Sequence, residues 1–302
     1  MKIVYGHTDS IYVECDSIEK GMEVCEYLNT EVQKLFPNVF DLDEHPVQLE
    51  FEKYFKSLGV GTTKNRNAGL ITWKDGNYLD EDEFVMTGFT AKRVSETSLA
   101  KETQKGVLKM WVEGVSEIEI TDYLHHIYFN VLQGKIDWSK IVKRSRFRSE
   151  RFNVECLNCK RNNWKSQYTL NELIDRKSMG RECCDKPNYV TLEGKRPVIG
   201  GGIEGILYYN SFHEIPITDS YLYYRIAPAP VQYLHPFTGR YTQPRYYSCE
   251  TEAQIKEANL MPDWSHYAES VIKKAEPIYR AMEWNVMSIK QDSSIRELAE
   301  WL

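Results

Sequence analysis

The feature of this sequence that most constrains its fold is a polar pentapeptide near the start, flanked by two β-rich runs. Residues 2–5 and 11–13 are rich in β-branched and aromatic side chains, which favour extended strands. Gly6-His7-Thr8-Asp9-Ser10 between them is typical of a tight turn. The sequence therefore predicts a β-hairpin whose tip carries Asp9, and a carboxylate on a rigid tip is suited to bind a metal ion. The alternative is an ordinary surface turn, because Gly, Asp and Ser are common in turns of any β protein.

The apolar pattern beyond the hairpin predicts a mixed fold. Helices are expected over residues 18–35 (capped by Asp16 or Ser17), 98–115 and 121–132. Strands are expected over residues 47–51, 68–73 and 77–79, with the last two joined by a turn at 74–76. Helical periodicity then fades until Ile255. The order strand, helix, strands, helix indicates an antiparallel α+β layer.

Composition narrows the class of protein. Of the 302 residues, 42% are hydrophobic and 27% are charged, enough for about two domains with their own cores. No apolar run reaches membrane-spanning length, and the first residues lack the pattern of a secretory signal. We therefore expect a soluble, cytoplasmic protein without a membrane partner. The seven cysteines, four of them clustered, fit an intracellular metal site better than a secreted disulfide framework.

The charges are distributed unevenly. Residues 1–52 contain twelve acidic and three basic residues, whereas residues 135–165 contain ten basic and three acidic residues. Carboxylates are suited to hold cations, and a basic segment is suited to contact phosphates. The alternative for the basic run is a solvated charged surface. Its interleaved residues Trp138, Phe147 and Trp164 are interpreted as packing residues.

A second candidate site lies in the cysteine cluster. Cys156 and Cys159 have the spacing of a zinc knuckle, and Cys183 and Cys184 follow at a separation typical of a zinc ribbon. Adjacent cysteines point to opposite sides of an extended backbone, so both can bind one ion only if the chain turns there. We expect a structural Zn²⁺, which would organise a mostly polar segment. The alternatives are a disulfide between the two pairs, or simple buried thiols.

Two further features are interpreted as structural. Residues 200–205 satisfy G-x-G-x-x-G, but they lack a clear preceding strand and are followed by β-prone Ile206-Leu207-Tyr208-Tyr209. We interpret them as a flexible connector. The tyrosine-rich stretch 208–247 could stack on nucleic acid, but tyrosines between Pro and Gly turns favour strand and hairpin core. The isolated histidines 213, 235 and 266 are expected in surface or core roles.

Residues 5–10, with the order Tyr-Gly-x-Thr-Asp-Ser, resemble the third palm motif of the family B DNA polymerases, in which x is usually Asp rather than His7. Later segments resemble the same family in the same order. They are the strand after the palm helix (49–53), the segment that tracks the primer minor groove (63–70), the strand and helix that end the palm (88–104), and the closing thumb helices (263–267 with Pro277 and Trp284). The resemblance implies the C-terminal part of a palm over residues 1–115. It implies a mixed thumb over 116–302, within which we interpret the cysteine cluster, in a region that resembles the family least, as a Cys-rich insertion at about 152–190.

The resemblance implies nucleotidyl transfer with two Mg²⁺ ions, one activating the primer 3′-hydroxyl and the other holding the incoming triphosphate. In the family pattern the second acid of the hairpin, matching Asp9, is the indispensable ligand. The first acid, matching His7, is more peripheral, so His7 is compatible with activity although it removes a negative charge near the ions. Thr8 belongs to the same catalytic motif. Glu52 matches an acidic position close to the metals.

The resemblance also implies DNA contacts. Lys64 and Arg66 match the segment that contacts the primer, whereas Asn65 and Asn67 stand where the family usually has Lys and Tyr, so the grip on the primer is expected to be altered. Arg93 and Lys101 are candidates for backbone contacts. In the basic run, the candidates for phosphate contacts are Lys143, Arg144, Arg146 and Arg148.

Several family motifs are not found in these residues: Asp-x-x-Ser-Leu-Tyr-Pro, the fingers motif Lys-x-x-x-Asn-Ser-x-Tyr-Gly, and the exonuclease acids. We therefore expect the small subunit of a split, archaeal or viral DNA-directed DNA polymerase, a heterodimer that is inactive until assembled. The larger subunit would carry the exonuclease, the first palm motif and the fingers, and the other partners would be primer-template DNA and dNTP. The exposed half-palm should then present an apolar interface and an unpaired strand edge. The expected location is the nucleoid or the cytoplasm of a virus-infected cell.

Two alternatives belong to other classes. A non-catalytic DNA-binding or scaffold subunit derived from a polymerase would explain His7, Asn65 and Asn67 as decay, although a decayed site has no reason to keep Asp9. A zinc-ribbon adaptor would explain the cysteines but leaves the first hundred residues unexplained.

Overall fold

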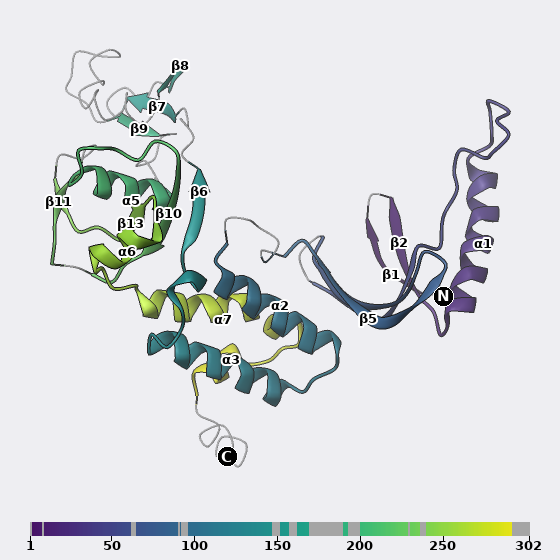
Figure 1. Ribbon diagram of the computed structural model, residues 1–302. Coiled ribbons are helices and arrows are strands. Elements are labelled where there is room, and N and C mark those ends of the chain that lie inside the picture. The colour runs from purple at the N-terminus through teal and green to yellow at the C-terminus, as the bar shows by residue number, and fades with distance from the viewer. Residues whose placement is uncertain are drawn as a thin grey trace. The chain divides into compact units, whose positions relative to one another are not determined.

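The computed structural model describes residues 2–7, 9–61, 65–89, 91, 96–146, 152–156, 162–168, 190–192, 200–228, 230–235 and 240–291. Helices and antiparallel sheets are mixed in it, so the α+β prediction is confirmed (Figure 1). The chain forms two compact units. The first comprises Met1–Arg93, Ala100–Tyr128 and Val271–Leu302, and the second comprises Val94–Leu99 and Phe129–Ser270. The functional boundary expected at residue 115 stays a prediction.

The first unit contains two antiparallel sheets. Strands β1 (Lys2–His7) and β2 (Ser10–Glu14) form the predicted hairpin, and this is a sheet of two strands. Strands β3 (Lys53–Val60), β4 (Asn67–Lys74) and β5 (Asn77–Thr87) form the other sheet with β4 in the centre. Asp75 and Gly76 join β4 to β5 with φ of 49° and 86°. Two successive positive φ values suit a tight hairpin turn, which explains why this turn was predictable.

Helix α1 (Ile18–Leu35) begins and ends where the pattern predicts, with the Ser17 hydroxyl accepting the amide of Lys20. The strand predicted over residues 47–51 was wrong, because β3 begins only at Lys53. The backbone of Leu49 is instead bound by a side chain of α1. Its N–H donates to Asn29 Oδ1 at 2.6 Å, and its carbonyl accepts from Asn29 Nδ2 at 2.8 Å. The N–H and C=O of Leu49 therefore form hydrogen bonds with a side chain and not with a neighbouring strand.

A helical core completes the first unit. It contains residues of α2 (Ser98–Val112), α3 (Glu117–Leu132), α7 (Trp264–Ala281) and the 3-10 helix η4 (Val286–Lys290). Fully buried members include Val107, Leu108, Leu124, Ala275 and Ile289. The predicted end of the second helix and start of the third each differ by a few residues from these bounds. The α2 indole of Trp111 lies directly over Gly59 of β3, where a Cβ would overlap the ring, so the absence of a side chain there lets sheet and helix pack closely.

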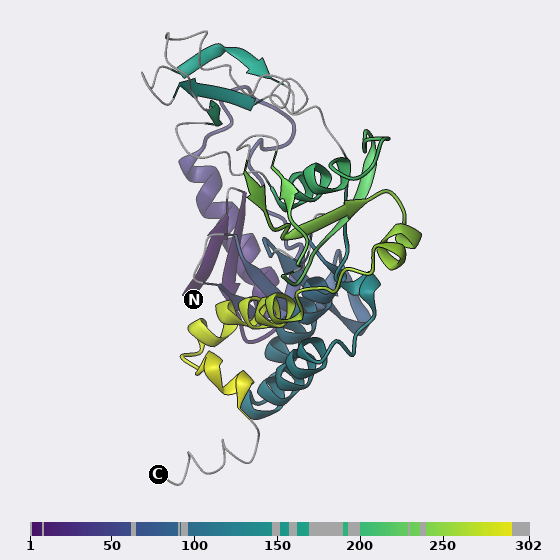
Figure 2. The same cartoon turned by 90° about the vertical axis from the view of Figure 1, so that its left-hand side faces the viewer.

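The second unit is built on a three-stranded sheet of order β13–β10–β6: β6 (Lys143–Arg146), β10 (Ser220–Arg225) and β13 (Tyr246–Cys249). Helix α5 (Gly201–Asn210) packs on β10 and β13, as Figures 1 and 2 show, and α6 (Glu252–Ala258) follows β13. The smaller elements are the 3-10 helix η2 (Trp138–Lys140) and strands β7 (Phe152–Cys156), β8 (Asn162–Tyr168), β9 (Val190–Leu192), β11 (Tyr233–Leu234) and β12 (Tyr241–Thr242).

The tyrosine-rich stretch forms the core of this unit, as predicted. Tyr208, Tyr221, Tyr224, Tyr233 and Tyr247 are all buried. Trp138 also has the predicted packing role, because its ring lies 5.6 Å from that of Tyr224 and 6.3 Å from that of Trp264, measured between centroids.

The interpretation of residues 200–205 as a flexible connector was wrong, because Gly201 begins α5. The glycines allow the helix to approach the sheet. A Cβ on Gly201 would lie 2.6 Å from the ring of Tyr246, and one on Gly202 would lie 2.6 Å from the hydroxyl of Tyr221. These close contacts with side chains of the sheet explain why glycine stands at both positions. No helix in the described part of the chain is long and apolar enough to span a membrane.

Candidate active site

Asp9 lies at the tip of the β1–β2 hairpin. Residues His7 and Ser10 pair across the hairpin, so Asp9 comes directly before the first residue of β2. It is exposed, and the Ser10 hydroxyl donates to its Oδ1 at 3.1 Å. An exposed carboxylate oxygen is the kind of donor that Mg²⁺ prefers. His7 is the last residue of β1, its side chain lies outside the description, and Thr8 lies outside the described residues.

Aromatic contacts fasten the hairpin to β3. The Tyr12 ring of β2 lies between two others, with centroids 5.4 Å from Tyr5 and 5.9 Å from Phe55. The hydroxyl of Tyr54 donates to the carbonyl of Cys15, just after β2, at 3.2 Å. A two-stranded hairpin is marginal by itself, so these contacts hold the strands that carry Asp9.

A pair of hydrogen bonds joins the hairpin to the segment before β4. The Tyr5 hydroxyl donates to Asn65 Oδ1 at 3.1 Å and accepts the backbone N–H of Asn65 at 3.2 Å. The sequence pattern identified Asn65 only as a departure from the expected Lys and gave no indication of this contact. A tyrosine preceding the turn and an asparagine in a polar loop are too common to predict their pairing.

Glu52 does not complete a metal cluster in the part of the chain that is described. Its side chain is more than half exposed, and its Oε1 lies 2.6 Å from Lys53 Nζ. Among the described residues, no three His, Cys, Asp or Glu side chains are grouped closely enough to hold an ion. Asp9 therefore has the chemistry to bind a hard cation, and its role as a metal ligand stays a prediction.

The predicted zinc site falls largely outside the described residues. Cys159, Cys183 and Cys184 are not described, and Cys156 is the last residue of β7 with an undescribed side chain. The prediction of structural zinc therefore remains untested. The cysteines that are described, Cys15, Cys25 and Cys249, are free thiols.

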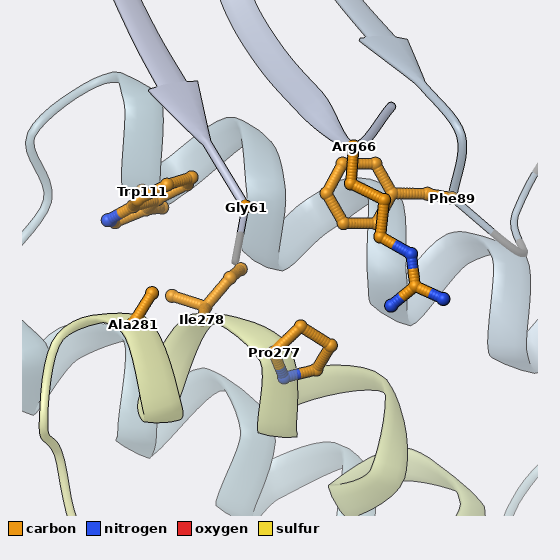
Figure 3. A pocket seen from close by; sticks show the side chains of 7 residues that line it. All are labelled: Gly61, Arg66, Phe89, Trp111, Pro277, Ile278 and Ala281. Atoms are coloured by element: carbon orange, nitrogen blue, oxygen red, sulfur yellow. The ribbon is translucent and has the colours of Figure 1, made fainter. Parts of the chain in front are cut away.

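Arg66 lines a small pocket in the first unit. The other lining residues are Gly61, Phe89, Trp111 of α2, and Pro277, Ile278 and Ala281 of α7. In Figure 3 the guanidinium extends past the ring of Phe89 on the side that Pro277 borders. The volume of about 20 Å³ holds roughly one water molecule, which excludes a nucleotide here. The pocket is thus a packing gap beside a half-buried cation.

The predicted phosphate contacts on β6 differ in their surroundings. Lys143 Nζ lies 3.3 Å from Glu96 Oε1, and both side chains are less than a third exposed, so Lys143 is held in an ion pair. Arg144 and Arg146 point away from that pair by strand alternation and are exposed. Lys101 is half-buried in the first turn of α2. Lys64, Arg93 and Arg148 lie outside the described residues.

Comparison with known proteins gives one consistent result. A family model described as "DNA polymerase family B" matches residues 1–282. The "DNA polymerase 2" of Aeropyrum pernix is 28% identical over 142 residues, which is 47% of this chain and 15% of that protein. The "DNA polymerase 037L" of Invertebrate iridescent virus 6 is 27% identical over 157 residues, covering 47% of this chain and 12% of that protein. The chain therefore spans less than a fifth of the length of these relatives.

A solved structure shares the fold. The family B DNA polymerase from the archaeon Pyrobaculum calidifontis matches with a TM-score of 0.51 and 15% identity. The match covers 92% of this chain and 26% of that protein.

Proposed function

Because this chain belongs to DNA polymerase family B, we propose that it supplies Asp9 as a metal ligand, and a DNA-binding thumb, for template-directed nucleotidyl transfer. The observation that carries the proposal is the position of Asp9, exposed at the tip of a hairpin fixed to β3 and to Asn65. Such anchoring keeps a carboxylate in place, which is what a metal-assisted displacement requires.

In this proposal each residue has a limited task. Asp9 would hold Mg²⁺ through a carboxylate oxygen, and the Ser10 hydroxyl, which donates to Oδ1, would help to orient that carboxylate. A pair of Mg²⁺ ions, when bound, would activate the primer 3′-hydroxyl and neutralise the charge of the triphosphate. His7 adds no negative charge beside them at neutral pH, and Thr8 belongs to the same turn. Glu52 is a further candidate metal ligand, although its Oε1 forms an ion pair with Lys53 in this structure.

The active centre would be completed by a polypeptide carrying the first palm motif, the fingers and the exonuclease. Two observations support a missing neighbour. Among the residues that the structure describes, the β1–β2 sheet has two strands, and apolar side chains on it are exposed: Ile3 (61%), Val4 (47%) and Ile11 (46%). Exposed strand edges and apolar faces are typical of surfaces that become covered. A larger partner subunit is our proposal for what covers them, and the chain alone would then be inactive.

DNA would be held by cations on both units. Arg144 and Arg146 are exposed on β6 and suited to phosphates, and the proposal extends to Lys64, Arg66, Arg93, Lys101 and Arg148. Lys143 would contribute less, because it is paired with Glu96. A structural Zn²⁺ at Cys156, Cys159, Cys183 and Cys184 remains part of the proposal.

The test is primer extension with Mg²⁺ by this chain mixed with a polypeptide that carries the missing family motifs. We expect extension only when both are present, and loss of extension with Asp9→Asn, because the amide lacks the charged oxygen that the proposed Mg²⁺ site requires. Asp43→Asn, which removes an exposed acid from the loop after α1, is the matched control and should leave the rate unchanged.

The second candidate is a DNA-binding or scaffold subunit without catalysis. It is favoured by Asn65, which replaces a cation of the family pattern, and by the lack of a three-ligand cluster among the described residues. Extension that is indifferent to Asp9→Asn would establish this alternative, while DNA affinity would still depend on the basic residues of β6.

A further inference from the structure

Both hydrogen-bonding functions of the Tyr5 hydroxyl are directed to one residue. The hydroxyl donates to the Asn65 side chain at 3.1 Å and accepts the Asn65 backbone amide at 3.2 Å. The two residues are sixty positions apart in the sequence. Because a hydroxyl hydrogen can be given to one acceptor while the oxygen accepts from another donor, the two bonds are compatible. They fix Asn65 by its backbone as well as by its side chain.

Asn65 is also fixed from its other side. Its φ is 61°, in the left-handed region where Asn is enriched among non-glycine residues. Gly88, with a φ of 74°, lies against it so closely that an added Cβ would be 2.8 Å from the Asn65 carbonyl carbon and would overlap the oxygen. The amide of Gly61 donates to the carbonyl of the next residue, Arg66, at 2.7 Å. Asn65 is thus in contact with both Tyr5 and Gly88, next to the hydrogen bond between Gly61 and Arg66.

The two partners stand beside functionally important residues. Tyr5 lies in β1, four residues before Asp9, and Asn65 lies between Lys64 and Arg66. We propose that Tyr5 and Asn65 are a positioning pair that sets the metal-binding hairpin against the primer-contacting segment, an inference that rests on the proposed function. Neither residue touches the reacting atoms in this proposal. Their effect would be geometric, and a displacement of about 1 Å in an active site can reduce a rate by about a hundredfold.

The pair depends on the hydrogen-bonding groups of asparagine at position 65. A lysine at that position, which is the residue expected from the family pattern, has three donors and no acceptor, so it could not accept the Tyr5 hydroxyl proton. Asn supplies the acceptor and tolerates the left-handed backbone. Asn65 therefore supplies a link between the two segments at a position where the family pattern has a cation.

The central variant is Tyr5→Phe, which removes the hydroxyl and keeps the ring that packs on Tyr12. Tyr12→Phe is the matched control, because it makes the same change on the facing strand, where no hydrogen bond of the hydroxyl is found among the described residues. Asn65→Asp keeps the side-chain acceptor and the backbone amide, so it should behave like the wild type. Asn65→Ala removes the acceptor. If the pair acts as a unit, the double variant Tyr5→Phe/Asn65→Ala should be no worse than the more impaired single one.

Two measurements distinguish a failure of the Tyr5–Asn65 pair from a failure of the proposed function. The first is amide hydrogen exchange at Asn65 in the chain alone, which needs no activity. It should accelerate by about tenfold in Tyr5→Phe, the equilibrium value of one hydrogen bond, and should not change in Tyr12→Phe. The second is steady-state extension in the assembled enzyme. There kcat should fall by about tenfold or more in Tyr5→Phe at unchanged thermal midpoint, with KM for the dNTP changed less than kcat.

Each outcome decides something. Unchanged exchange at Asn65 in Tyr5→Phe would overturn the pair itself. Accelerated exchange with an unchanged kcat would leave a structural contact and overturn its positioning role. If the wild-type assembly shows no extension, the proposed function fails and the positioning role fails with it, while the exchange data still decide whether the link exists.

Discussion

Gly88 offers the sharpest test of how the loop before β4 is held. Substitution by Ala adds a Cβ at a φ of 74°, a backbone conformation that costs an L-residue about 1–2 kcal/mol. The same Cβ would overlap the carbonyl oxygen of Asn65. Backbone atoms cannot rotate away as a flexible side chain can, so relief requires the loop to move. Overpacking of this kind typically costs a further 1–3 kcal/mol.

Gly76→Ala is the matched variant. Gly76 has a φ of 86°, and an added Cβ would have no neighbour within 4 Å, so only the conformational cost applies. We expect Gly88→Ala to lower the free energy of unfolding by about 2–5 kcal/mol and Gly76→Ala by about 1–2 kcal/mol. Urea denaturation followed by far-UV circular dichroism gives both values if the slopes are equal. Equal losses for the two variants would refute the close approach of Gly88 to Asn65.

Three further predictions concern other parts of the chain. Asn29→Ala removes the partner of the Leu49 amide and leaves the Leu49 carbonyl only the Cys25 thiol at 3.4 Å, so it should cost about 1–3 kcal/mol in urea denaturation. A neutral result would refute the role of the Asn29 bonds. Burial raises the pKa of the Cys249 thiol from 9.0 to about 12. Because folding favours the neutral thiol, the contribution of Cys249 to the free energy of unfolding is complete below pH 9 and is lost as the pH rises toward 12. The urea midpoint of Cys249→Ala should therefore decline less steeply than that of the wild type between pH 9 and pH 12. Arg144→Ala should weaken binding to primer-template DNA and reduce the salt slope by about one, whereas Lys143→Ala should mainly reduce stability by removing the half-buried ion pair with Glu96.

Elements with strong local signals were predictable from the sequence. Helix α1 has its apolar spacing and its Ser17 cap, and the β4–β5 turn has Asp75-Gly76, so local chemistry and tertiary structure agree there. The resemblance to family B is confirmed by the family model over residues 1–282. The palm–thumb boundary, the metal and DNA ligands and the zinc site stay predictions.

The errors came from contacts between distant residues. Residues 47–51 alternate like a strand, but Asn29, twenty residues earlier, binds the backbone of Leu49. The glycines at 200–205 suggested flexibility, whereas Gly201 and Gly202 are needed where α5 approaches Tyr246 and Tyr221. A single sequence shows which residues permit a close approach but not which partner uses it. The same limitation hid the link between Tyr5 and Asn65.

The first unit is assembled from three separated stretches, and this has a consequence for folding during synthesis. Its helical core needs Val271, Ile278 and Tyr279 of α7 and Ile289 of η4, which are almost fully buried and come from the last stretch. The buried hydroxyls of Thr121 and Tyr279 are 2.6 Å apart, although 158 residues separate them in the sequence. The ribosome therefore has to release residues up to Ile289 before this core can close. The intervening unit has all its residues before this last stretch, so it can fold before the helical core closes.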